Sequence, residues 1–404
     1  LTENIVEVFK RRMPSGGTLH IEEIQDQVEL ELMRSGEQKV ARAYVLYREE
    51  RKQLRQQESP QKEEKEGIKI TLENGEEDTL DLNRLEKMVT EACEELEGTD
   101  SNLIIEEANK NLYDGVTEED ARTSLVMTAR TLVEQEPNYT YVTARILLDN
   151  IRTESLTYLG MQKQATQTEM QELYPQAFRN FLAKGVENEI LNPELLEMDI
   201  EKLGQAIDPS RDNLFTYLGL QTLYDRYFIH DTETRYELPQ VFFMRVSMGL
   251  ALREENREER AIEFYNLLSS FDYMSSTPTL FNSGTKHSQL SSCYLTTVPD
   301  DLHGIYGAIQ DNAMLSKWAG GLGNDWTPVR GLGSQIKGTN GKSQGVVPFL
   351  KVVNDTAVAV NQGGKRKGAV CSYLETWHVD IEEFVELRKN TGDDRRRTHD
   401  MNTA

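Results

Sequence analysis

Apolar residues recur every three or four positions through most of the first 270 residues of the chain. The first such run carries Ile21, Ile24, Val28 and Leu32, and a second run follows a break at Gly36. Residues at this spacing line one face of an α-helix, so the pattern predicts two consecutive helices near the N-terminus.

The same plan returns after residue 67. The stretch VTEEDARTSLVMTARTLVEQEPNYTYVTARILLDNIRTE predicts a helix, a break at Pro137 and a second helix. Its end aligns with the earlier VARAYVLYREER, which places Arg42 opposite Arg145, and we interpret this as a partial internal duplication. Only the second copy keeps a leading stretch, IKITLENGEEDTLDL, whose alternating apolar residues around Asn74-Gly75 predict a β-hairpin.

The two copies are separated by REERKQLRQQESPQKEEKEG, which has few apolar residues and charges of both signs. Such a segment cannot bury enough apolar surface to fold, so we expect a linker. The pattern thus divides the chain into a partial first copy, a charged linker, a second copy, a helical region and an α/β part, with expected bounds of 1–50, 51–67, 68–155, 156–270 and 271–404.

The helical region contains two apolar stripes with helical spacing. We expect both to form protein core and not a cofactor site, because a buried helix face needs this spacing. The stripes are Tyr217, Leu220, Tyr224 and Tyr227, and then Val241, Met244, Met248 and Leu252.

The pattern changes in the last part of the chain. Short apolar runs such as GVVPFLKVV and GAVCSYLE alternate there with glycine-rich loops and with helical stretches such as VDIEEFVELRKN. This alternation is typical of an α/β domain, in which loops carry the chemistry.

Charge and cysteine usage narrow the function classes. The formal net charge of −23 and the pI of about 4.8 argue against a nucleic-acid partner, since binding a polyanion needs many cationic contacts. Three cysteines without a CxxC pair indicate a reducing compartment, which we take to be the cytoplasm. No apolar run is long enough for a membrane span. Both ends of the chain lie inside continuing patterns, so we expect a segment of a longer protein.

Cys293 lies among small polar residues and turn formers, in STPTLFNSGTKHSQLSSCYLTTVPDDL. We place it in a loop or at the end of a strand. A thiol there can be a nucleophile, half of a redox pair or a small buried apolar group, and spacing alone favours the buried alternative.

Two loops suit anionic ligands. Glycines in KWAGGLGNDWTPVRGLGSQIKGTNGKSQG are interleaved with Arg330, Lys337 and Lys342, so backbone N–H groups and cations could hold a phosphate. The match to known nucleotide motifs is poor, and a plain surface loop is an equal alternative. The second loop, NQGGKRKGAV, concentrates positive charge in an acidic protein, with a solvated turn as the alternative.

The six histidines show no metal-ligand spacing, so no metal site is expected.

Six motifs in order carry a resemblance to a known family: STPTLFNSGT, LSSCYL, AGGLG, GTNGKSQG, NQGGKRKGA and LETWHVDIEEFVELRKNTG. Together they resemble the large catalytic subunit of ribonucleotide reductases, of the aerobic class that works with a diiron small subunit. The likeness extends from about residue 156 to residue 404, and the two N-terminal copies resemble ATP-cones. It implies an α/β fold, in which mostly helical ATP-cones and a helical connecting region precede the first part of a ten-stranded α/β barrel.

The resemblance implies specific roles for residues near the thiol. Cys293 takes the position of one of two thiols that reduce the ribose and form a disulfide together. Thr277 and Ser292 match positions that hydrogen-bond the substrate, and Gly321 matches one whose backbone approaches it.

The resemblance also implies an allosteric specificity site for a deoxynucleoside triphosphate or ATP. Lys337 stands there where many relatives have arginine, which keeps the charge and loses the bidentate geometry. A following loop would relay the identity of the effector to the substrate base. The specificity-site positions are Asp300, Asp301, Leu302, Arg330 and Lys337, and the relay-loop positions are Gln362, Lys365 and Arg366.

The implied activity is the reduction of ribonucleoside diphosphates by thiyl-radical chemistry, controlled by ATP, dATP and other dNTP effectors. No cofactor would be bound directly by this chain, because a metal-containing small (β) subunit supplies the radical. Further implied partners are thioredoxin or glutaredoxin and other copies of the chain, in homodimers and higher oligomers. One alternative is the adenosylcobalamin-dependent class of the same family. Another is a nucleotide-sensing and oligomerisation module that has no turnover of its own.

Two departures from the family pattern matter. The Asn-x-Cys-x-Glu motif of the radical cysteine is absent from this segment, so the segment alone should not reduce a ribonucleotide. Cys93 and Cys371 match no motif position, and we expect both to be structural.

The second departure lies in the second ATP-cone, where Leu72-Glu73-Asn74-Gly75 replaces a basic pair. A carboxylate where a phosphate should bind predicts the loss of ATP binding. Overall-activity control would then reside mainly in the first cone.

Overall fold

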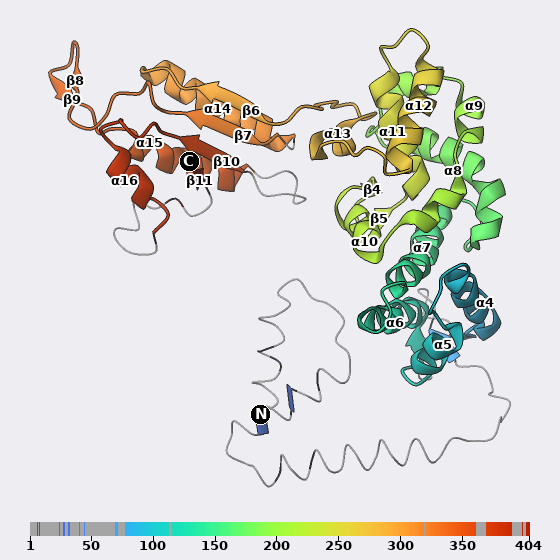
Figure 1. Cartoon of the computed structure of the whole chain (residues 1–404). Coiled ribbons are helices and arrows are strands. Elements are labelled where there is room, and N and C mark those ends of the chain that lie inside the picture. The colour runs from blue at the N-terminus through green and yellow to red at the C-terminus, as the bar shows by residue number, and fades with distance from the viewer. Residues whose placement is uncertain are drawn as a thin grey trace. The chain divides into compact units, whose positions relative to one another are not determined.

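The computed structural model describes residues 69–71, 77–112, 115–318, 320–360, 369–389, 398 and 401–404, together with single positions before residue 69 (6, 8, 24, 27, 28, 31, 32, 40 and 44). The chain divides into two compact units, Leu1–Gly67 and Ile68–Ala404. The helix pair and Arg42 expected in the first unit lie outside the continuously described ranges. The elements below belong to the second unit (Figure 1).

The second unit begins with a small sheet followed by four helices. Strand β1 (Lys69–Thr71) pairs antiparallel with β2 (Glu77–Thr79) and parallel with β3 (Val116–Thr117). The two strands of the expected hairpin are therefore present, while its Asn74-Gly75 turn lies outside the described residues. The helices are α4 (Leu82–Cys93), α5 (Ser101–Asn109), α6 (Glu118–Thr131) and α7 (Tyr139–Tyr158).

Helix α4 shows how the sequence sets these elements. Asp81 precedes the helix, and its side chain accepts a hydrogen bond from the backbone N–H of Arg84, which satisfies one of the free donors of the first turn. The residues that α4 buries follow the helical period and pack into the core of the unit; they are Leu85, Met88, Val89 and Ala92.

Helix α7 belongs to two parts of the fold at once. Near its middle, Asp149 forms a salt bridge of 2.5 Å with Arg84 of α4. Near its end, the Ser155 hydroxyl donates to the backbone carbonyl of Arg235, in the helical region that follows. No break separates the two halves, so the small sheet with its helices and the helical region share one continuous helix.

The helical region continues from α7 (Figure 1). Both predicted apolar stripes contribute to its core, on α10 and α11, so the expectation that they are structural is confirmed. The elements are α8 (Gln167–Glu187), η2 (Pro193–Glu197), α9 (Ile200–Gln205), η3 (Pro209–Leu214), α10 (Tyr217–Arg226), β4 (His230–Asp231), β5 (Thr234–Arg235), α11 (Pro239–Ala251), α12 (Arg257–Ser269) and α13 (Thr277–Asn282).

A fully buried ion pair lies between α11 and α13. Arg245 Nε donates to Glu237 Oε1 at 2.6 Å, and neither side chain is exposed to solvent. The same guanidinium donates to the carbonyls of Leu280 (3.3 Å) and Ser283 (2.6 Å), which are free carbonyls at the end of α13. The other Glu237 oxygen accepts the N–H of Ile229. Each buried charge is therefore both paired and hydrogen-bonded, as burial of a charge requires.

The last part of the chain forms a parallel sheet in the order β11-β10-β7-β6. Helices connect the strands, as parallel pairing requires, and a short hairpin lies between β7 and α15. The strands are β6 (Tyr294–Thr297), β7 (Leu322–Asp325), β10 (Val370–Tyr373) and β11 (Asn402–Thr403), the hairpin is β8 (Gln335–Ile336) and β9 (Gly341–Lys342), and the helices are α14 (Leu302–Lys317), α15 (Val347–Ala359) and α16 (Ile381–Glu386).

The two apolar runs singled out in this part have different structures. GAVCSYLE contains strand β10, whereas most of GVVPFLKVV lies in helix α15. The run forms a helix because Pro348 occupies its first turn, where proline is tolerated, and because Val347, Leu350 and Val353 then follow the helical period into the core. None of the helices within the described ranges is long and apolar enough to cross a membrane.

Replacing Arg245 with methionine should lower the free energy of unfolding by about 3–5 kcal/mol, because Glu237 would remain buried without a counter-charge. Arg253→Met is the matched control, since Arg253 pairs with Glu194 at 2.9 Å but is 81% exposed, and exposed pairs contribute little. Urea denaturation of both variants measures the difference. Equal effects of the two substitutions would contradict the central role of the buried pair.

Candidate functional site

Cys293 lies directly before strand β6, and its side chain is exposed to solvent. The hydroxyl of Ser292 donates to its sulfur at 3.7 Å, and the N–H of Gly321 donates to that hydroxyl at 3.1 Å. The alternative of a small buried thiol, which spacing alone favoured, is therefore wrong. Cys293 precedes a strand whose alternate residues, such as Leu295, point away from the core, and this places the sulfur on the open side.

The close packing at position 321 favours glycine. A Cβ atom there would lie 3.2 Å from Ser292 Oγ and 3.3 Å from Cys293 Sγ, tighter than nine in ten real Cβ contacts, so these side chains would have to shift. Strand pairing brings the two segments together, because the N–H of Tyr294 donates to the carbonyl of Gly321 at 2.8 Å. The thiol of Cys293, the hydroxyl of Ser292 and the backbone of Gly321 therefore lie together where β6 and β7 begin.

Helix α13 fixes the loop that carries the thiol. The hydroxyl of Thr279 donates to the carbonyl of Leu290 at 2.9 Å. The side-chain amide of Asn282 donates to the carbonyls of Gln289 at 2.8 Å and Trp318 at 3.1 Å, so that one residue holds the entrances to β6 and β7 together. Sequence reasoning missed Thr279 and Asn282, although both lie inside the quoted motif STPTLFNSGT.

Thr277 is the first residue of α13 and is half-buried. Its hydroxyl lies 3.2 Å from the hydroxyl of Tyr227, which belongs to the helical region. The structure therefore brings Cys293, Ser292 and Gly321 into direct contact, whereas Thr277 is linked to them through the body of α13.

Asp300 and Arg330 form the centre of a second cluster. Arg330 Nε lies 2.9 Å from both carboxylate oxygens of Asp300, and the backbone N–H of Arg330 donates to one of them at 3.0 Å. Burial alone would raise the pKa of Asp300, but the hydrogen bonds from Arg330 and its positive charge hold that pKa below its ordinary value. The pKa of Arg330 is raised, chiefly by its hydrogen bond to Asp300.

The remaining residues expected at this cluster lie on its flanks. Asp301 caps helix α14 by accepting the N–H of Gly304 at 2.9 Å, and Leu302 is the exposed first residue of that helix. Lys337 is exposed at the turn between β8 and β9. Asp300, Asp301, Leu302 and Arg330 are thus contiguous, while Lys337 is placed on a separate hairpin that follows Arg330.

Two buried residues that sequence reasoning did not assign hold this hairpin in place. The Asp380 carboxylate accepts the backbone N–H groups of Leu332 (2.8 Å) and Val346 (2.9 Å), one on each side of the hairpin. His378 lies 2.7 Å from the carbonyl of Val329 through Nε2 and accepts the N–H of Asp380 through Nδ1. These two partners assign the proton to Nε2, because a carbonyl can only accept. The sequence signal that could have identified these two residues is the HVD, residues 378–380, in the motif LETWHVDIEEFVELRKNTG.

The relay-loop residues Gln362, Lys365 and Arg366 lie outside the described residues. Within the described ranges, no group of three or more His, Cys, Asp or Glu side chains could hold a metal ion.

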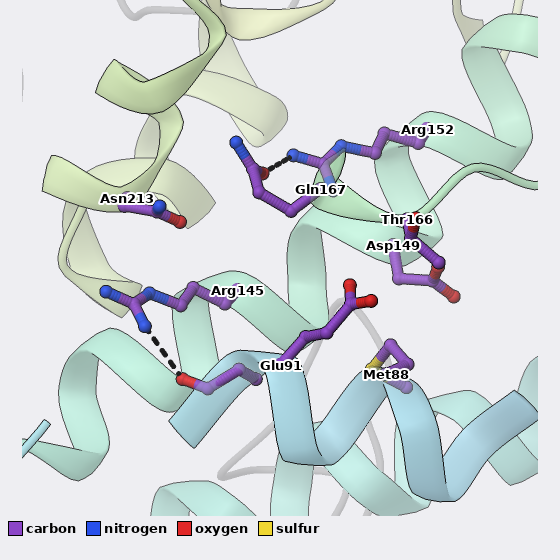
Figure 2. Close-up of a pocket in the computed structure, with 9 residues that line it drawn as sticks. Met88, Glu91, Arg145, Asp149, Arg152, Thr166, Gln167 and Asn213 are labelled. Carbon is purple, nitrogen blue, oxygen red and sulfur yellow. Dashed lines mark hydrogen bonds between the residues drawn. The ribbon is translucent and has the colours of Figure 1, made fainter. Parts of the chain in front are cut away.

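A pocket also lies where α4, α7, η3 and the start of α8 meet, and Figure 2 shows the residues that line it. Arg145 donates there to the carbonyls of Ala92 (3.1 Å) and Glu94 (2.8 Å), at the end of α4. Burial is the main cause that lowers the pKa of Arg145. Arg145 thus binds the carbonyls that end α4, while its Nε and the Nε of Arg152, another residue that lines the pocket, are buried without a hydrogen-bond partner among the described residues.

Three family models match the chain. The ATP cone domain matches twice, at residues 1–53 and 68–154, which confirms the internal duplication. The ribonucleotide reductase all-alpha domain matches residues 213–288, and the ribonucleotide reductase barrel domain matches residues 291–404. The expected fold class is confirmed, because the helical parts precede the parallel strands that begin the barrel domain.

Curated relatives agree with these matches. The ribonucleoside-diphosphate reductase subunit alpha of Chlamydia muridarum is 50% identical over 415 residues, which cover all of this chain and 39% of the relative. The corresponding protein of Helicobacter pylori is 39% identical over 336 residues, or 83% of this chain and 41% of the relative. The large subunit of Caenorhabditis elegans is 39% identical over 292 residues, or 72% of this chain and 36% of the relative.

The chain thus spans about two fifths of the length of these relatives. The similarity to the Chlamydia muridarum protein covers the whole of this chain, and with it both ATP cone matches, the all-alpha domain and the matched part of the barrel domain. The chain belongs to the ribonucleotide reductase large-subunit family.

Proposed function

We propose that this chain is part of the large subunit of a ribonucleoside-diphosphate reductase, which converts ribonucleotides to 2′-deoxyribonucleotides. The observation that carries the proposal is the exposed thiol of Cys293, with the Ser292 hydroxyl and the Gly321 N–H at its side. A sulfur that must cycle between thiol and disulfide has to remain accessible, which a packed core would prevent. The amide and the hydroxyl can hold a sugar or phosphate oxygen beside it.

In the proposed reaction, Cys293 and a second thiol from the rest of the protein each give one electron and one proton to the substrate. The 2′-hydroxyl leaves as water, a hydrogen takes its place, and the two sulfurs form a disulfide. A metal-containing small subunit would supply the radical that starts and ends each turnover. Thioredoxin or glutaredoxin would reduce the disulfide, which fits a cytoplasmic enzyme.

We further propose that Asp300 and Arg330 belong to a site for nucleoside triphosphate effectors. A carboxylate can accept hydrogen bonds from sugar hydroxyls, and a guanidinium can pair with phosphate. Their mutual contact holds both groups in place before an effector arrives, which lowers the ordering cost of binding. Asp301, Leu302 and Lys337 would complete this site, and the relay loop would transmit the identity of the effector to the substrate base.

Replacing Cys293 with serine in the complete protein, assayed with its small subunit and a reductant, should abolish multiple-turnover reduction of a ribonucleoside diphosphate. Serine keeps the size of the side chain and removes its redox chemistry, so effector binding should be unchanged. Cys93→Ser is the matched control, because Cys93 is half-buried on α4 and lies outside the site. Sustained turnover by the Cys293 variant would refute the redox role.

Replacing Asp300 with asparagine should weaken binding of a deoxynucleoside triphosphate about tenfold, because the amide cannot hold the Arg330 guanidinium by two oxygens. Since the pKa of Asp300 is lowered, the wild-type affinity should persist in mild acid and fall only below the ordinary pKa of an aspartate. Calorimetric titration at several pH values measures both effects. Unchanged affinity in the variant would exclude Asp300 from the effector site.

The second ATP-cone should not bind ATP, because Glu73 and Asn74 stand where the family has a basic pair. A fragment of residues 68–160, which keeps all of α7 and is first checked for helical structure by circular dichroism, should show no heat of binding when titrated with ATP. The double variant Glu73→Lys, Asn74→Arg restores the pair and should gain measurable affinity. Micromolar binding by the unaltered fragment would overturn this part of the proposal.

A further inference from the structure

One face of the parallel sheet is left open, and the candidate catalytic thiol lies on it. Side chains alternate between the two faces of a strand, and cross-strand partners share a face. Leu322, Val370 and Leu374 point into the core, so the residues directly before and after each of them along the strand point to the other face. The strand register therefore places three rows of residues on the open face: Cys293 beside Gly321, then Leu295 beside Gly323 and Cys371, and then Thr297 beside Asp325 and Tyr373.

Gly323 clears the middle of this face. A Cβ atom at that position would lie 2.7 Å from a methyl carbon of Leu295 and 3.1 Å from the ring carbon Cε2 of Tyr373. Two large side chains from the neighbouring strands therefore meet over a bare stretch of β7. The ring of Tyr373 extends from β10 toward β6, and 42% of its surface remains exposed.

Tyr373 and Cys371 are two residues apart on β10, so their side chains share the open face. The pKa of Tyr373 is raised, first by a hydrogen bond to the Cys371 side chain and by the charge of that group, and further by burial and by the charge of Cys293. The sequence pattern offered no role for Cys371 and suggested a structural one. In the structure its side chain is half-exposed and lies on the same face as Cys293.

The spacing of the strands excludes a direct bond between these two cysteines. Strands β6 and β10 flank β7, so they are about 10 Å apart, and the two residues are also offset by about 7 Å along the strands. Their Cα atoms are then about 12 Å apart, whereas a disulfide needs less than about 7 Å. Cys371 is therefore not the second redox thiol.

We propose that Tyr373 is a positioning residue of the nucleotide site, forming a wall on the open face two rows along the sheet from Cys293, with its ring over Gly323. This inference rests on the proposed function and names the residues that hold the ribonucleotide against the thiol. An aromatic ring supplies a rigid apolar surface for the sugar or base, and its hydroxyl can bond a sugar oxygen at the edge. Gly323 lets the ring lie low enough on the sheet to leave room for the ligand.

Tyrosine variants of the complete protein, assayed with its small subunit, test the wall. Tyr373→Leu should raise the KM for a ribonucleoside diphosphate about tenfold while leaving the thermal unfolding temperature unchanged, and Tyr373→Phe should restore KM to within about threefold. Tyr141→Leu, at a half-exposed tyrosine on α7, is the matched control and should leave KM unchanged. An unaltered KM in Tyr373→Leu would overturn the proposal.

Substitutions at two glycines test the same wall while leaving Tyr373 itself unchanged. Gly323→Ala should raise KM, because the new methyl group must displace Tyr373 and Leu295. Gly307→Ala on α14 is its control, since a Cβ atom there meets nothing within 4 Å. Equal KM values for the two variants would contradict a role for the ring position.

Labelling with N-ethylmaleimide provides a readout that needs no variant to fold. Cytidine diphosphate, added with an effector, should slow the labelling of both Cys371 and Cys293 in the complete protein, as followed by peptide mass spectrometry. Cys93, on α4, should label at the same rate with and without the nucleotide. Protection of Cys293 without protection of Cys371 would overturn this inference alone. Protection of neither thiol, with sustained turnover by Cys293→Ser, would instead refute the proposed function.

Discussion

The arrangement of the site depends on the buried pair of Glu237 and Arg245. The guanidinium neutralises the carboxylate and at the same time binds the carbonyls that end α13. Helix α13 in turn positions the thiol loop through Asn282, whose amide joins the entrances of β6 and β7. Hydrogen bonds and the short backbone segments between them therefore connect a fully desolvated charge pair in the helical region with the loop that carries Cys293.

The two candidate clusters differ in how they are held. Around Cys293, the contacts are made by main-chain groups and small side chains, and the glycine at position 321 leaves space for the strand beside the sulfur. Around Asp300 and Arg330, opposite charges fix each other, and the buried Asp380 secures the adjoining hairpin by two backbone N–H groups. The first arrangement exposes a thiol among uncharged groups, whereas the second presents charged groups at the surface.

Much of this could be predicted from the sequence, because local patterns determine it. The helical period identified the core residues of α10 and α11, and the small polar residues and turn formers around Cys293 indicated a loop or strand end, while its role in a site followed only from the family resemblance. The burial of the thiol was misjudged, since a lone cysteine in a polar loop does not reveal which face of a sheet it joins. The roles of Asn282, Asp380 and Tyr373 depend on contacts between distant segments, and the apolar run at Val347 needed its proline to be recognised as the start of a helix.

The continuity of α7 joins the second cone to the helical region. The first half of this helix completes the second cone, and its second half is buried in the helical region through residues such as Ile151 and Leu156. Deleting the second cone would therefore cut a helix whose second half packs in the core of the helical region, so the two parts of the chain share one folding element.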